Sequence, residues 1–219
     1  MLMEGQIQEE QIELEKDQRI EFWLHLVRTN QTPSTARISL NAITSRSLAK
    51  ALWDNSSIVA LDVSRMKLSD IAGAYLCRAL RNNTSIVKLD LESNYFGPKT
   101  CKTLADSLTT NTTVTHVNLE SNLLSRGAKG HDIGGVEAMA EMLKTNTTLV
   151  YLNMWRCGVA SEGGHKVVTG MGKKRMRCTT RYPSAMLHTT SPERSTSPLA
   201  SPSWVLLSRT CVRGRKLTL

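Results

Sequence analysis

The sequence of 219 residues has few aromatic side chains and no long hydrophobic run. Phe, Trp and Tyr make up 5% of the chain, which leaves few rings on which nucleobases could stack. No stretch approaches the ~18 to 20 consecutive apolar residues of a membrane-spanning helix. The opening MLMEGQIQEEQ carries acids where a secretory signal would carry bases followed by an apolar core. We therefore expect a cytoplasmic protein with no membrane span, with the nucleus as an alternative location.

The sequence also lacks the usual patterns of catalytic, metal and disulfide sites. The cysteines are odd in number and form no CxxC pair; they are Cys77, Cys101, Cys157, Cys178 and Cys211. None of the histidines shares a recognisable motif with a nucleophile and an acid, and no GxxxxGK[ST] phosphate loop is present. We expect reduced thiols, no metal, no cofactor and no enzymatic activity.

Acidic residues are nearly missing from the last part of the chain. Residues 172–219 contain ten bases and a single acid, Glu193, so this segment alone matches the formal net charge of +9. The acidic residues 1–28 and the mildly basic residues 29–171 offset one another. Four of the six prolines and many Ser and Thr residues also lie in 172–219, which predicts a disordered basic tail. Nucleic acid is an expected partner only through this tail.

A short phrase of the form Asn-x-Ser/Thr recurs with spacings of 28, 28 and 35 residues, starting at Asn55, Asn83, Asn111 and Asn146. An LxxLxL pattern follows each phrase, as in Ile86, Leu89 and Leu91, and predicts a short strand. A pair of apolar residues four apart precedes each phrase, as in Leu104 and Leu108, and predicts a helix. The repeating unit is therefore a strand, a turn, a helix and a turn.

This unit resembles the leucine-rich repeat family, and specifically its ribonuclease-inhibitor-like subfamily. The template LxxLxLxxNxL is matched by IVKLDLESNYF at 86–96 and by VTHVNLESNLL at 114–124. The segment EAMAEMLKTNTTLVYLNM at 137–154 is similar to the repeats of tropomodulins, and immune-receptor repeat domains are also similar. The resemblance implies an α/β fold, a leucine-rich repeat solenoid (horseshoe segment) with parallel strands inside and helices outside.

The resemblance covers residues 34–171. An incomplete first repeat is expected to place Ile38 and Leu40 inward and Arg37 outward. Residues 1–33 are expected to form an N-terminal helical cap, because apolar residues from Ile20 to Val27 follow the spacing of one helical face. The insertion SRGAKGHDIGG at 125–135 is expected to enlarge one turn flexibly.

Several polar residues have structural interpretations. The family uses an amide at the positions of Asn94 and Asn122 to satisfy backbone groups in the turn after the strand, and Cys157 takes the same place. The recurring Asn-x-Ser/Thr phrases also match the glycosylation sequon, but their place in the repeat predicts a role in the turn.

The side chains that the strand alternation turns outward are the candidates for binding a partner. Acids gather on the central strands, and an aromatic pair lies at one end. The predicted partner-binding residues are Asp62, Lys88, Asp90, Glu92, His116, Asn118, Glu120, Tyr151, Asn153 and Trp155. We expect a non-enzymatic scaffold that binds a protein with a basic or mixed patch through its concave strand face. The alternatives are a GTPase-activating regulator of the Ran-regulating type and an actin pointed-end capping protein.

Overall fold

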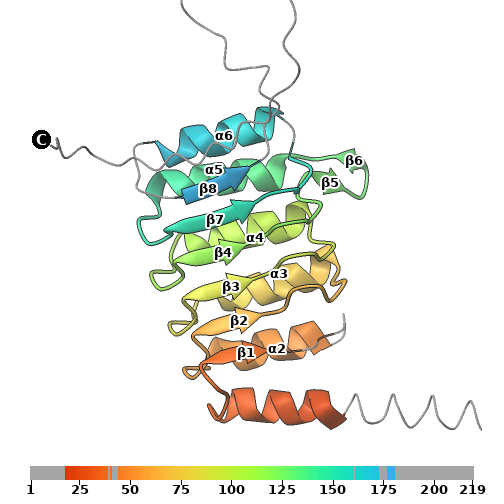
Figure 1. Cartoon of the computed structure of the whole chain (residues 1–219), viewed down its shortest axis with the longest axis vertical. Helices are drawn as coiled ribbons and strands as arrows, with labels where there is room; N and C mark the ends of the chain where they lie inside the picture. Colours follow the sequence, from red (N-terminus) through yellow and green to blue (C-terminus); the bar gives the residue numbers. More distant parts are fainter. Residues whose placement is uncertain (1–17, 39, 41–43, 160, 173–176, 181–219) are drawn as a thin grey trace, which may run out of the picture.

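A computed structural model describes residues 18–38, 40, 44–159, 161–172 and 177–180. A helix over residues 18–28 comes first. Strands and helices then alternate along the chain (Figure 1) in the order β1 (Thr35–Arg37), α2 (Thr44–Trp53), β2 (Ala60–Asp62), α3 (Asp70–Ala79), β3 (Lys88–Asp90), α4 (Pro98–Leu108), β4 (His116–Asn118), β5 (Arg126–Gly127), β6 (Gly130–His131), α5 (Gly134–Thr145), β7 (Tyr151–Met154), α6 (Ser161–Met171) and β8 (Arg177–Thr180).

The strands of three or four residues form one parallel sheet in the order β1-β2-β3-β4-β7-β8. Helices α2–α6 stack beside this sheet as a second layer (Figure 1). The middle residue of each strand points toward the helices, so that Leu61, Leu89, Val117 and Leu152 are in register and buried. Parallel strands need crossover connections, and here a helix makes each of the five crossovers. The expectation of an α/β fold with parallel strands is confirmed.

The core lies between the two layers because each repeat supplies apolar residues to both. In the third repeat, Ile86 and Leu91 come from the strand segment and Leu104 and Leu108 from α4, and all four are fully buried. Burying one such side chain contributes about 1.5 to 3 kcal/mol. A single repeat would leave both of its flanks exposed, so the stack as a whole is the stable unit.

The asparagines of the recurring phrases connect neighbouring repeats. Asn83 Nδ2 donates to the carbonyl oxygens of Leu52 (2.7 Å) and Asn55 (2.9 Å) in the preceding repeat, and its Oδ1 accepts from the backbone N–H of Ile86 (2.8 Å). Asn111 repeats this arrangement one unit later. The side-chain amides are buried and hydrogen-bonded. The predicted structural role is confirmed, and these sequons are not accessible for glycosylation in the fold.

The asparagines that follow the strands make a second set of contacts. Asn122 Nδ2 donates to the carbonyl oxygens of Leu91 (3.0 Å), Leu119 (2.8 Å) and Glu120 (3.3 Å), and its Oδ1 accepts from Phe96 N–H (3.1 Å). Asn94 does the same in the preceding repeat. The role predicted for both residues is confirmed.

Cys157 occupies the equivalent position in the repeat of β7. Its Sγ–H donates to the carbonyl oxygen of Leu119 at 2.9 Å. Burial raises the pKa of the Cys157 thiol to about 12, so the thiol is protonated at neutral pH. A protonated, buried thiol agrees with the structural role expected from the sequence.

The N-terminus of α4 is capped by a side chain from the preceding repeat. Its N-cap residue, Gly97, has no side chain to accept a hydrogen bond. Instead, Asp70 Oδ1 accepts from the backbone N–H groups of Gly97 (2.8 Å) and Thr100 (2.7 Å), and Asp70 Oδ2 accepts from Lys99 N–H (3.1 Å). A carboxylate at this place also interacts favourably with the helix dipole.

Replacing Asp70 with alanine is therefore expected to lower the free energy of unfolding by about 1 to 2 kcal/mol, the usual effect of losing a cap. Urea unfolding of the two full-length chains measures the difference. Asp106→Ala is the matched control, because Asp106 is an exposed carboxylate within α4, away from its N-terminus. Equal losses in both variants would contradict the capping role.

Three details differ from the sequence-based expectations. Ile38 and Leu40 are buried and Arg37 is exposed, as expected, but the register differs by two residues, because Ala36 rather than Ile38 aligns with Leu61 and Arg37 aligns with Asp62. The insertion forms a small antiparallel hairpin, β5–β6. Residues 177–180 form β8 on the edge of the sheet, inside the segment predicted to be a disordered tail. The remaining parts of that prediction, at 173–176 and 181–219, lie outside the described residues.

Candidate functional site

The strand face, meaning the side of the sheet opposite the helices, carries all ten residues predicted to bind a partner. The strand register arranges them in three rows. The first row holds Lys88, His116 and Tyr151, the middle row holds Asp62, Asp90, Asn118 and Asn153, and the third row holds Glu92, Glu120 and Trp155.

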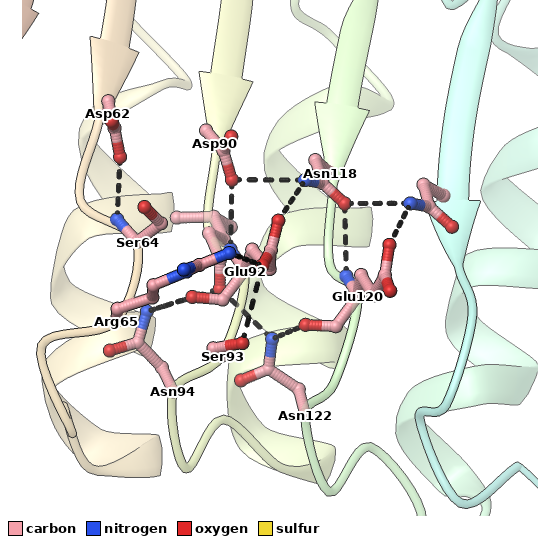
Figure 2. Close-up of polar contacts among 12 residues, drawn as sticks. Asp62, Ser64, Arg65, Asp90, Glu92, Ser93, Asn94, Asn118, Glu120 and Asn122 are labelled. Atoms are coloured by element: carbon pink, nitrogen blue, oxygen red, sulfur yellow. Dashed lines mark hydrogen bonds and ion pairs between the residues drawn. The ribbon is translucent and has the colours of Figure 1, made fainter.

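Side chains of the middle row are held by hydrogen bonds within the sheet (Figure 2). Each accepts from the backbone N–H two residues further on; for Asp90 Oδ1 this is Glu92 N–H, at 3.0 Å. Neighbours in the row are also joined, because Asn118 Nδ2 donates to Asp90 Oδ1 (3.1 Å) and Asn153 Nδ2 donates to Asn118 Oδ1 (3.0 Å). The middle row therefore stabilises the turns after the strands. Several of its polar atoms already have intramolecular hydrogen bonds and are less available to a partner.

Two of the four carboxylates on the strand face form ion pairs. Arg37 pairs with Asp62. Arg65 Nη2 lies 2.9 Å from Glu92 Oε1 (Figure 2). Desolvation raises the pKa of the Asp62 carboxyl, but hydrogen bonds from Ser64 and Arg37 outweigh it, so that this pKa lies below its ordinary value. The face is consequently less acidic than its carboxylates alone suggest.

Asp90 has a different environment. Partial burial raises the pKa of its carboxyl above the ordinary value, and the nearby carboxylates of Asp62 and Glu92 raise it further, against the lowering effect of the hydrogen bonds from Glu92 N–H and Asn118. No ion pair between described residues involves Asp90. The pKa of Asp90 is therefore higher in the native state than in the unfolded chain. For this reason the free energy of unfolding falls as the pH rises from the ordinary pKa of an aspartate through the higher native pKa.

Asp90→Asn is therefore expected to stabilise the chain at pH 7 by about 1 kcal/mol, because it removes an unfavourable charge and adds an amide that can donate toward Asp62. Asn118 and Asn153 show that the position accepts this side chain. Urea unfolding measures the gain, which should shrink at about pH 3, where Asp90 is protonated. A loss of stability at pH 7 would contradict this interpretation.

The first and third rows are less constrained and carry the aromatic residues. The rings of His116 and Tyr151 stack, with centroids 5.8 Å apart and an interplanar angle of 28°. Trp155 is half-buried beside Glu120 in the third row. Glu120 accepts from Asn153 Nδ2 at 3.0 Å but takes part in no ion pair between described residues. Trp155 therefore presents aromatic surface next to the Glu120 carboxylate, and the His116–Tyr151 pair lies across the middle row from them.

A shallow hollow lies on the strand face, and the first two rows line it. Its walls include Lys88, Asp90, His116 and Tyr151. In the part of the chain that the structure describes, no group of His, Cys, Asp or Glu side chains could hold a metal ion. Among the same residues, no helix has the length and apolar character needed to cross a membrane.

Two further residues belong to the strand face and were not predicted. Arg65 lies in the left-handed turn position that Ser93 and Ser121 occupy in the next repeats, and it pairs with Glu92. A charged residue at a turn position was the sequence feature that could have identified it. Thr179 extends the middle row, because its hydroxyl bonds to Asn153 Oδ1. Nothing in the sequence indicated Thr179, since its repeat is 26 residues after β7 and lacks a leucine.

Comparisons with known proteins identify a shared fold. No protein-family model matches the chain, and no curated protein matches it significantly. Among solved structures, actin-binding site 2 (ABS2) of leiomodin-1 is similar, with a TM-score of 0.54 and 20% identity over 68% of this chain and 86% of that one. The C-terminal domain of a Caenorhabditis elegans tropomodulin matches with a TM-score of 0.54 and 19% identity over 69% and 90%. The chain therefore shares its fold with tropomodulin and leiomodin domains.

Proposed function

We propose that the chain is a non-enzymatic scaffold that binds a protein partner through the strand face. One observation carries this proposal: the described helices lie on one side of the sheet (Figure 1), while the other side presents the stacked His116 and Tyr151 and, across the middle row, Trp155 next to Glu120. Half-exposed aromatic residues are frequent centres of binding energy at protein interfaces.

The proposal includes the shape of the surface. The repeats correspond to the ribonuclease-inhibitor-like subfamily, and the strand face is the concave side of a horseshoe segment. Strands stack ~4.8 Å apart, whereas helices need ~8 to 10 Å, so the stack curves toward its strands. A concave surface lets one partner contact several repeats at once.

The charges favour a partner with a basic or mixed patch. Glu120 and Asp90 make no ion pair with a described residue and would gain one from a partner's Lys or Arg. Asp62 and Glu92 are already paired and contribute less. The half-exposed Trp155 next to Glu120 would supply the apolar part of the contact.

Affinity capture with the full chain tests the proposal. We expect the combination Glu120→Lys and Trp155→Ala to weaken binding of the captured partner by about 30-fold or more, which corresponds to ~2 kcal/mol. The matched control makes the same kinds of change on the helix side, Glu141→Lys and Trp53→Ala, at two exposed residues. A partner that tolerates the first pair of changes but not the second would contradict the proposed surface.

Actin is the second candidate, as a specific partner of this surface. The observation in its favour is the likeness to a domain described as an actin-binding site of leiomodin-1. Calorimetric titration of the full chain with actin monomers tests it directly. Binding that is lost in the Glu120→Lys and Trp155→Ala variant would support actin as the partner, and no heat of binding would remove this candidate.

A further inference from the structure

The helix layer ends in an exposed apolar position that is buried in every preceding repeat. Cys77 in α3, Ala105 in α4 and Ala140 in α5 occupy equivalent positions and are at most 4% exposed, because the next helix covers each of them. Val168 is the equivalent residue of α6, and it is 47% exposed. No described helix lies beyond α6 to cover it.

The sheet layer ends in the same way. Leu89, Val117 and Leu152 are in register and almost completely buried, whereas Cys178 at the equivalent position of β8 is only partly buried. Met171, at the end of α6, is also only partly buried. Val168, Met171 and Cys178 therefore define an open end of the core, which we call the C-terminal end face.

The opposite end of the stack is covered by the chain itself. The helix over residues 18–28 lies against the first repeat, where Leu24 and Val27 are at most 1% exposed (Figure 1). A stack of repeats needs such a cover at both ends, because its terminal repeats otherwise leave apolar core exposed to water.

We propose that the apolar run WVLL at residues 204–207 covers the C-terminal end face. The chain continues at residue 181 directly after β8, at this end of the stack, and WVLL is the longest apolar run in 181–219. The intervening residues 181–203 can span several tens of ångströms at ~3.3 Å per residue, so reach is not limiting. Tethering also gives the run an effective concentration of roughly millimolar, above that of a second copy in dilute solution.

A cysteine placed at residue 168 reports on this contact. In the full chain with Cys178→Ser and Cys211→Ser, the substitution Val168→Cys puts a thiol on the C-terminal end face, while the remaining Cys77, Cys101 and Cys157 are buried. Adding Leu206→Asp within the run is expected to increase the rate of maleimide labelling at residue 168 by about tenfold or more, since it abolishes the cover. Leu199→Asp, outside the run, should leave the rate unchanged.

A second reporter separates this effect from unfolding. Val59→Cys replaces a residue that is 41% exposed in the second repeat, far along the stack from α6. Its labelling rate should not respond to Leu206→Asp. Equal labelling at residue 168 with and without Leu206→Asp would overturn the proposal. Protection at residue 168 that increases with protein concentration would also overturn it, in favour of a second copy as the cover.

Discussion

Replacing Asn122 with alanine is expected to lower the free energy of unfolding by about 3 kcal/mol or more. The side chain of Asn122 is 1% exposed, and it is hydrogen-bonded to three carbonyl oxygens and the Phe96 N–H. Alanine would leave the buried Phe96 N–H without its partner, at a cost of about 1 to 3 kcal/mol. It would also remove one donor from each of the three carbonyl oxygens, at about 0.5 to 1.5 kcal/mol per hydrogen bond, although each oxygen keeps a second donor, from Asn94, Cys157 or the Ser93 N–H. Urea unfolding of the full-length variant, followed by circular dichroism, measures the loss.

Asn122→Cys is the informative comparison, because the repeat of β7 uses Cys157 in the same place. A thiol can donate one hydrogen bond, as Cys157 does to Leu119, so the loss should be smaller than for alanine. Equal losses for both variants would contradict this expectation, because they would show that a hydrogen bond from a thiol adds no stability at this position.

Gly135→Ala is expected to destabilise the chain by about 1 to 3 kcal/mol, although alanine is the better helix former. A Cβ atom at Gly135 would lie 2.4 Å from the carbonyl oxygen of Pro98 and 2.8 Å from Cys101 Cβ. The closest atom belongs to the backbone of α4 and cannot rotate away, so α4 and α5 would have to separate. Thermal unfolding of the full chain measures the effect.

Gly134 provides the control at the neighbouring position. A Cβ atom there would meet only the Asp132 side chain, at 3.2 Å, and residue 134 is exposed. Gly134→Ala should change the stability little or raise it slightly. If both variants lost stability equally, the flexibility of the helix terminus rather than the packing of α5 on α4 would be the cause.

The repeat could be predicted from the sequence because its signals are local and recur. The spacing of 28 residues between Asn55, Asn83 and Asn111 places equivalent leucines in register, and a buried asparagine has few roles other than bonding to the backbone. The C-terminal end of the stack was harder to predict. β8 arrives 26 residues after β7 with Cys178 in the leucine position, so neither spacing nor residue type identified it.

The rows of the strand face could likewise be predicted from the alternation of strand side chains, but their contacts could not. Arg65 approaches Glu92 from the turn of another repeat, and Asn118 joins Asp90 across the strands. Such contacts depend on the three-dimensional register. They explain why a surface expected to be acidic is partly neutralised, and why Glu120 and the aromatic residues are now the stronger candidates for binding.

The most direct test of the proposed function is site-specific photo-crosslinking in the full chain. A benzophenone amino acid at Trp155, on the strand face, should form a crosslink to a protein partner in cell extract that mass spectrometry can identify. The same amino acid at Lys102, exposed on the helix side in α4, should not form this crosslink. Crosslinking of the same partner from residue 102 but not from residue 155 would contradict binding through the strand face.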